Sequence, residues 1–190
     1  HDHIPSRFGI IPRANLHADV QWFETEPSFI LHSANYYEHG DEIIMDSCLS
    51  FDPKGPGVSE HKDHNARIMA HLDKHQTKTR LHRLTFNLST GKSSQTRIND
   101  EIVEFPVCAN AVKGYPYRYA YASLFEPGQW LMNGIIKFDL DTGGTTRYHY
   151  GPQRYGGEVH FAAKRNSQSE DDGYLIVFVQ DLAADQSECL

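Results

Sequence analysis

Several features that would assign this sequence to a class of protein are missing or scarce. The 190 residues include three cysteines, Cys48, Cys108 and Cys189, which are far apart and in no Cys-x-x-Cys spacing. This argues against a cysteine zinc site and favours free thiols in a reducing compartment. No apolar run approaches the roughly 20 residues that a membrane-spanning helix needs. The net charge of −7 argues against nucleic acid as a partner bound through its phosphates.

An initiator methionine and a signal-peptide pattern are also missing. The first residue is His1, and no basic segment followed by an apolar segment opens the chain. The last residues stop directly after a strand-like run. We therefore expect a chain that is truncated at both ends. We also expect an intracellular protein, in the cytoplasm, or in the plastid if the source is a plant or an alga.

What the sequence does contain is mostly short strands and tight turns. The segments "LTFNLSTGK" (84–92) and "IKFDLDTGG" (136–144) share the pattern apolar-x-Phe-Asn/Asp-Leu-x-Thr-Gly. Phe86 aligns with Phe138, which is 52 residues later. Each segment predicts a strand, a turn in which glycine supplies a positive φ, and a second strand.

A repeat of roughly 50 residues made of antiparallel strands is typical of a β-propeller blade. Two further hairpins are expected, with turns at 38–42 and within 164–173. The second leads into "YLIVFV" (174–179), a continuous apolar run that predicts a fully buried strand. The sequence therefore predicts an all-β fold of about two to three blades. An all-β sandwich with a chance match is the alternative.

One segment interrupts the β pattern. Residues 58–76 are rich in helix formers and predict a short helical insertion between blades. His64, His71 and His75 would share one face of this helix, and only the last two have the i, i+4 spacing that can chelate one ion. No carboxylate completes a metal motif such as His-Glu-x-x-His. We expect a solvated, histidine-rich insertion rather than a metal site.

Three polar residues occur in apolar or glycine-rich strand contexts. His32 follows "SFIL", Glu104 lies in "EIVEFPV", and Glu158 lies in "RYGGEVHF". A buried carboxylate is costly unless it is paired. The two glutamates are 54 residues apart, close to one blade, and His32 precedes Glu104 by one blade plus about the length of the insertion. Equivalent places on successive blades converge on the propeller axis, where metal ligands would meet. A structural role for the histidine, and turn-capping or arginine-paired roles for the glutamates, stay open.

An ordered series of segments resembles the carotenoid cleavage oxygenase family, to which retinal pigment epithelial membrane protein belongs. The series covers essentially the whole chain. Its members are "PSRFGIIPR", "VQWFETEPSFILHSANYYEHGDEIIMDSC", "VEFP" with "YRYAYA", and "RYGGEVHFAAKRNSQSEDDGYLIVFVQD".

The resemblance implies one seven-bladed β-propeller domain, of which residues 1–190 would be a part that lacks the N- and C-terminal blades. It also implies a non-haem Fe(II) ion held by four histidines, three of which are hydrogen-bonded by glutamates. On this pattern His32 is one metal ligand, and Glu104 supports it. Glu158 would support a further histidine that lies outside this chain.

The implied activity is a dioxygenase reaction that cleaves a conjugated C=C bond with O2 and gives two carbonyl products. The implied substrates are an apolar polyene, a carotenoid or apocarotenoid, and O2. In the full-length protein, segments not present here could add a peripheral membrane contact. Two alternatives stay open, a stilbene-cleaving relative and a non-catalytic propeller used for binding. Because three of the four histidines are missing, we expect the fragment alone to be inactive.

Overall fold

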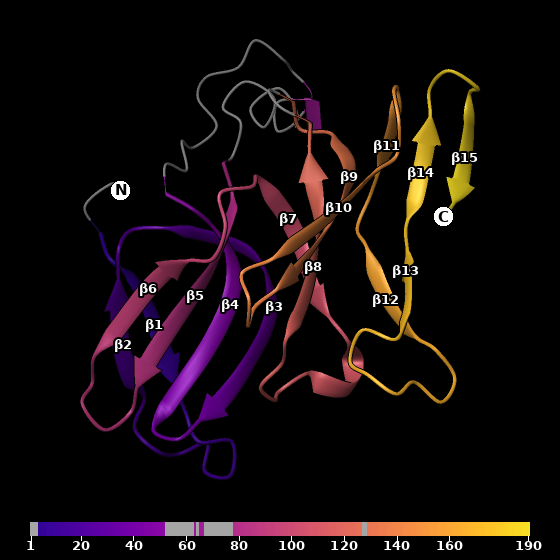
Figure 1. Cartoon of the computed structure of the whole chain (residues 1–190). Helices are drawn as coiled ribbons and strands as arrows, with labels where there is room; N and C mark the ends of the chain where they lie inside the picture. Colours follow the sequence, from indigo (N-terminus) through magenta and orange to yellow (C-terminus); the bar gives the residue numbers. More distant parts are fainter. Residues whose placement is uncertain (1–3, 52–62, 64, 67–77, 127–128) are drawn as a thin grey trace.

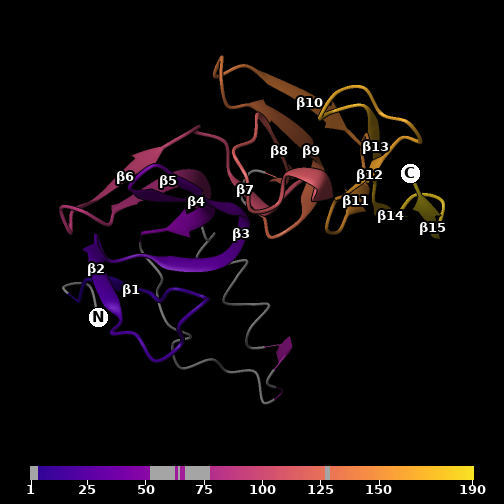
Figure 2. The ribbon, with the colours of Figure 1, turned by 90° about the horizontal axis from the view of Figure 1, so that it is seen from below.

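The strands form antiparallel sheets that lie side by side (Figures 1 and 2). The structure is a computed structural model that describes residues 4–51, 63, 65–66, 78–126 and 129–190. The helical insertion expected at 58–76, with His64, His71 and His75, falls almost wholly outside the described residues. The described part is nearly all β, as the sequence predicts.

The first blade is a four-stranded antiparallel sheet in which each strand pairs with the next along the chain. Its strands are β3 (Phe29–His39), β4 (Glu42–Ser50), β5 (Arg80–Asn87) and β6 (Ser93–Arg97). The turn expected at 38–42 joins β3 to β4, with Gly40 at a φ of 61°. A hairpin of β1 (Ser6–Ile10) and β2 (Gln21–Thr25) precedes this blade and packs Phe8 and Phe23 against Phe86.

The second blade has the same arrangement, and the third is partly present. The second consists of β7 (Val103–Cys108), β8 (Tyr119–Phe125), β9 (Met132–Asp139) and β10 (Thr145–His149), with the 3-10 turn η1 (Asn110–Val112) after β7. The third consists of β11 (Arg154–Gly156), β12 (His160–Ala163), β13 (Gly173–Ile176), β14 (Phe178–Asp181) and β15 (Gln186–Cys189). Strand β11 pairs with β9, so that β11, β14 and β15 continue the sheet of the second blade, whereas β12 and β13 form a separate pair. The prediction of two to three blades is confirmed.

The repeated turns adopt the same geometry in both complete blades. The amide of Gly91 donates to the carbonyl of Asn87 at 2.9 Å, and the amide of Gly143 donates to the carbonyl of Asp139 at 2.8 Å. Both glycines have positive φ, 70° and 73°. Glycine adopts this conformation without steric cost, so the repeated Thr-Gly pair specifies the turn locally. The 52-residue repeat is thus a structural repeat.

Strand β8 lies between two hydrophobic cores because its side chains alternate between the faces of the sheet. Ala120 and Ala122 pack in the core shared with the first blade, beside Leu81. Tyr121 points the other way, into the core shared with the third blade, together with Val159. Strand β8, with the sequence "YAYASLF", therefore packs against both the first and the third blade.

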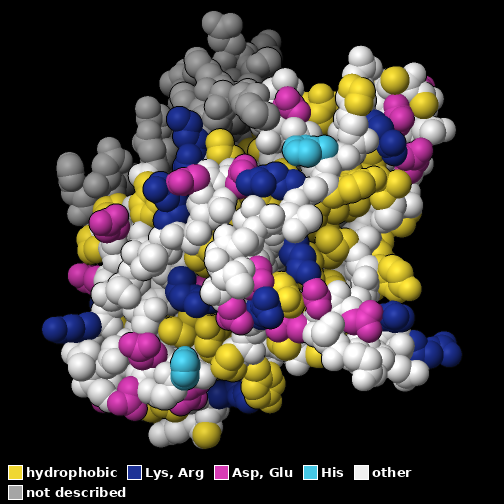
Figure 3. Space-filling model, viewed as in Figure 1, with side chains coloured by type: hydrophobic (Ala, Val, Ile, Leu, Met, Phe, Trp, Pro, Cys, Tyr) yellow, Lys and Arg dark blue, Asp and Glu magenta, His cyan; other side chains and the backbone are white. Residues whose placement is uncertain are grey.

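The run "YLIVFV" is not the fully buried strand that was expected. It is divided into β13 and β14, and only alternate residues are buried. Val177 and Val179 are 2% and 1% exposed, whereas Tyr174, Ile176 and Phe178 are 63%, 39% and 71% exposed. One face packs on the second blade, and no described segment covers the other. Apolar side chains accordingly gather over these strands at the right of Figure 3.

A buried histidine in the first blade leads us to expect that the stability depends on pH. His82 donates from Nδ1 to the carbonyl of Arg80 at 2.7 Å and packs edge-on against Phe51. Burial lowers the pKa of His82 below its usual value of 6.5, the hydrogen bond to the Arg80 carbonyl acts in the opposite direction, and the charges of Arg97 and Arg80 lower the pKa further. The unfolded chain therefore binds more protons than the folded chain when the pH falls below 6.5, and stability is lost there.

We expect the urea concentration at the midpoint of unfolding to decrease when the pH is lowered from about 7.5 to about 5.5. His82→Gln, which keeps a hydrogen-bonding side chain but does not titrate, should show a smaller fall. Equal falls in both proteins would contradict this assignment.

Candidate metal-ligand site

His32 lies inside β3, at an irregular part of its pairing with β4. The register shifts between Ile30 and Ser33 and again between Ser33 and Asn35. Such bulges turn individual side chains away from the regular alternation. The apolar residues before the histidine do not all enter the core as expected, because Leu31 is 48% exposed. The His32 side chain itself is 40% exposed.

Glu104 lies on β7 and is the hydrogen-bond partner of His32. Its Oε2 atom is 2.9 Å from Nδ1 of the His32 ring, although the two residues are 72 positions apart in the chain. The Glu104 side chain is completely buried. The contact between Glu104 and His32 that the family resemblance implies is therefore present.

A second irregularity, in β7, aims the Glu104 carboxylate. The pairing of β7 with β8 shifts between Glu104 and Val107, and Phe105 has a φ of 55°. A positive φ is uncommon for a bulky residue and marks local strain. It allows the amide of Phe105 to donate to Oε2 of Glu104 at 2.5 Å. The Phe105 ring also lies 4.7 Å from the His32 ring, measured between centroids.

Burial raises the pKa of Glu104 above its usual value. The hydrogen bonds from the Phe105 amide and from His32 act in the opposite direction, and the nearby charge of Glu158 raises the pKa further. The other carboxylate oxygen, Oε1, is buried and has no hydrogen-bond partner among the described residues. Such a group is costly to keep in a core and is characteristic of a functional site.

This arrangement is compatible with a ligand role for the histidine. A carboxylate that accepts from Nδ1–H selects one tautomer of the His32 ring and leaves a lone pair on Nε2. The side chain is 40% exposed, so the ring is not enclosed in the core. The geometry thus offers one oriented imidazole to a metal ion.

Glu158 lies between β11 and β12, on the third blade. Its apolar and glycine-rich context suggested a buried carboxylate, which the structure does not show. The residue is exposed. Its backbone is nevertheless held close to Glu104. Ser123 lies opposite Glu104 in the β7–β8 pair and donates to the carbonyl of Gly157 at 2.9 Å. Residues from three consecutive blades therefore meet at one place, while their roles at a metal stay predictions.

Ser123 and Phe105 were not identified from the sequence. Ser123 is fully buried and joins the strand of Glu104 to the segment of Glu158. A serine within the apolar strand "YASLF" is a weak signal, because serine is common in strands. The positive φ of Phe105 has no sequence signal, since the residue precedes Pro106, where extended backbone is favoured.

The described residues by themselves do not form a complete metal site. Among the described residues, no group of three or more His, Cys, Asp and Glu side chains could hold a metal ion. One carboxylate-backed imidazole fits a single ligand position of an iron centre, and the remaining ligands would have to come from elsewhere.

No helix within the described ranges is long and apolar enough to cross a membrane.

Comparisons with known proteins agree with this picture. The chain matches the family described as retinal pigment epithelial membrane protein over residues 1–190. It is 33% identical over 199 residues to a carotenoid 9,10(9',10')-cleavage dioxygenase from Crocus sativus, with 96% of this chain and 35% of that protein covered. It is 27% identical over 191 residues to an apocarotenoid-15,15'-oxygenase from Synechocystis, with 99% of this chain and 37% of that protein covered.

The fold has a close counterpart among solved structures. Cobalt-substituted Synechocystis ACO superimposes with a TM-score of 0.87 at 24% identity, over 100% of this chain and 38% of that one. At this identity the likeness shows the fold alone, and that fold is a seven-bladed β-propeller. The chain spans little more than a third of the length of these proteins.

Proposed function

The chain belongs to the retinal pigment epithelial membrane protein family of carotenoid cleavage oxygenases, and we propose from this membership that it is a segment of a non-haem Fe(II) dioxygenase. The proposed reaction cleaves a conjugated C=C bond of a carotenoid or apocarotenoid with O2 and gives two carbonyl products. The support is the family match along all 190 residues together with the relatives' names.

The single observation that carries the metal part of this proposal is the contact between His32 and Glu104. A fully buried carboxylate that orients a partly exposed imidazole is the usual arrangement behind a metal-bound histidine. His32 would hold the iron through Nε2, and Glu104 would keep the proton on Nδ1. Bound Fe(II) with neutral imidazole ligands would supply open positions at which O2 can react.

The reaction is tested with the full-length protein, a carotenoid substrate and ¹⁸O2. Dioxygenase cleavage predicts two carbonyl products that each carry one labelled oxygen, which mass spectrometry detects. Cleavage of a hydroxystilbene instead of the carotenoid would assign the stilbene-cleaving alternative. Binding of the polyene without any product would favour a non-catalytic propeller and overturn the proposal.

Glu104→Gln in the full-length protein is expected to weaken iron binding and turnover by about 10–100-fold without abolishing them. The amide can still accept a hydrogen bond from His32, but it lacks the charge that favours the correct tautomer. Iron affinity and turnover are measured side by side. Glu101→Gln is the matched control, because Glu101 is nearby on the chain but pairs with Arg147. Unchanged iron affinity in Glu104→Gln would contradict the assigned role.

A further inference from the structure

A three-residue segment at the start of β8, Tyr117–Tyr119, contacts all three blades, and we call it the hub. Tyr117 and Arg118 precede the strand, and Tyr119 is its first residue. The side chain of Tyr117 contacts the first blade. The backbone of the next two residues contacts the third blade, and the Arg118 side chain contacts its own blade.

The contact with the first blade is a buried hydrogen bond. The Tyr117 hydroxyl donates to Oδ2 of Asp46 on β4 at 2.8 Å. Asp46 is completely buried, and Arg83 of β5 also binds it through two hydrogen bonds of 2.8 Å each. Burial and the adjacent Asp46 carboxylate raise the pKa of Tyr117 far above its usual value, so the hydroxyl stays a donor.

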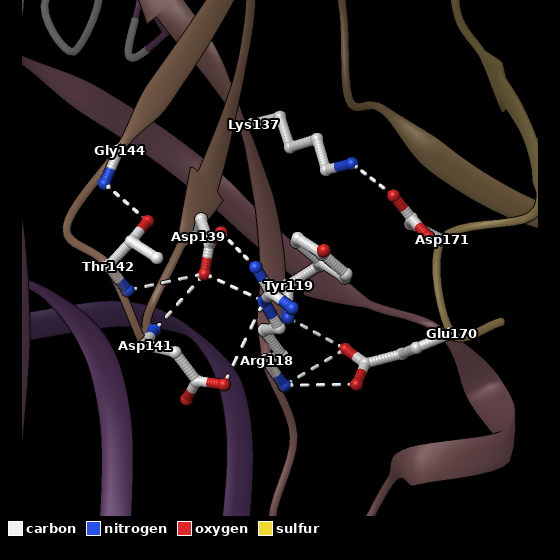
Figure 4. Close-up of polar contacts among 9 residues, drawn as sticks. All are labelled: Arg118, Tyr119, Lys137, Asp139, Asp141, Thr142, Gly144, Glu170 and Asp171. Carbon is white, nitrogen blue, oxygen red and sulfur yellow. Dashed lines mark hydrogen bonds and ion pairs between the residues drawn. The ribbon is translucent and has the colours of Figure 1, made fainter.

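The contact with the third blade is made by the loop between β12 and β13 (Figure 4). The Glu170 carboxylate accepts the amide of Arg118 at 3.0 Å and the amide of Tyr119 at 2.7 Å. The next residue, Asp171, pairs with Lys137 of β9 at 2.5 Å, and the Lys137 ammonium lies 4.0 Å from the centroid of the Tyr119 ring. The Glu-Asp-Asp-Gly motif thus ties the third blade to the second.

The third contact of the hub lies within the second blade itself. The Arg118 guanidinium binds both carboxylate oxygens of Asp139, at 2.9 and 2.7 Å, and Asp139 is the residue that begins the repeated turn (Figure 4). Arg118 holds the pKa of Asp139 well below its usual range. The carbonyl of Arg118 also accepts from the amide of Leu140 at 2.8 Å. The side chains and the backbone of the hub therefore make hydrogen bonds to all three blades.

We propose that the hub sets the angles between the three blades and thereby positions His32, Glu104 and Glu158 relative to one another. Strand β8 runs from the hub to Ser123, which faces Glu104 and holds the carbonyl before Glu158. A short stretch of one strand thus links the hub to the place where the three blades meet. The consequence for metal binding rests on the proposed function, whereas the blade geometry does not.

The first test measures blade geometry in the full-length, iron-free protein. Spin labels are attached at Thr96→Cys on β6 and Ala183→Cys in the third blade, both exposed positions, with Cys189→Ser to remove the exposed thiol. Tyr117→Phe and Glu170→Ala are expected to shift or widen the distance distribution between the labels. Glu170→Gln should restore it, because an amide oxygen still accepts the two N–H groups.

The matched control is Tyr150→Phe. Tyr150 is buried like Tyr117, but its hydroxyl has no hydrogen-bond partner among the described residues. Removing this hydroxyl should leave the distance distribution unchanged. If the hub variants lower only the melting temperature and leave the distances as in the wild type, the hub is merely structural and the proposal fails.

The second test measures iron affinity in the same variants. Tyr117→Phe is expected to lower it by about tenfold, in line with other outer partners of a metal site. In a Glu104→Gln background, where iron binding is weakened but still measurable, the substitution should cause a smaller loss than in the wild type, although its effect on the label distances persists. An equal loss in both backgrounds would overturn the positioning role. Altered distances in a protein that never binds iron would refute the proposed function and leave the hub standing.

Discussion

His32→Ala in the full-length protein is expected to abolish iron content and turnover while the fold survives. The substitution removes the oriented imidazole found among the described residues, and a metal centre that loses a directly bound ligand loses most of its affinity. The side chain is 40% exposed, so its removal opens no sealed cavity in the core. Iron is measured per protein molecule by elemental analysis, turnover by product formation, and folding by circular dichroism.

His39→Ala is the matched control for this prediction. His39 lies on the same strand but is exposed at its far end, next to the turn. It should retain full iron and turnover. Full iron occupancy in His32→Ala would show that this histidine is not a ligand, and the proposal built on it would fall.

The 190 residues expressed alone are expected to bind no stoichiometric iron, to cleave no polyene and to self-associate. A single imidazole cannot hold Fe(II) against water, so His32 is insufficient by itself. Unpaired strand edges favour association, and the open apolar face of β13 and β14 adds to it. Light scattering coupled to size-exclusion chromatography measures the association as a function of concentration.

Two substitutions distinguish association through this face from non-specific association. Phe178→Lys places a charge on the open face, where the native side chain is 71% exposed, and should reduce association. Leu16→Lys changes an equally exposed residue, at 73%, in the loop between β1 and β2, and should have little effect. A monomeric chain that purified with one equivalent of iron would contradict the prediction. It would also return His64, His71 and His75 to consideration as the metal site.

Local chemistry made the blades predictable from residues alone. Asn87 and Asp139 each begin a turn, and the positive φ of the glycine four residues later needs no distant partner. The same local logic located the hairpin turns near Gly40 and between β12 and β13. Burial was harder to predict. The run "YLIVFV" is apolar throughout, but whether both faces are covered depends on what packs against them.

The sequence by itself determined the all-β architecture, the 52-residue blade repeat and the approximate convergence of His32, Glu104 and Glu158, because these follow from turn residues and from spacing along the chain. Only the tertiary structure decided how they meet. Bulges in β3 and β7 bring a carboxylate within 2.9 Å of a ring 72 residues away, and spacing contains no information about bulges. The hub likewise depends on Asp46 and Glu170 reaching one short segment from two different blades. Contacts of this kind are set by the packing of blades on one another, and that packing depends on the whole set of interlocking side chains rather than on any one segment.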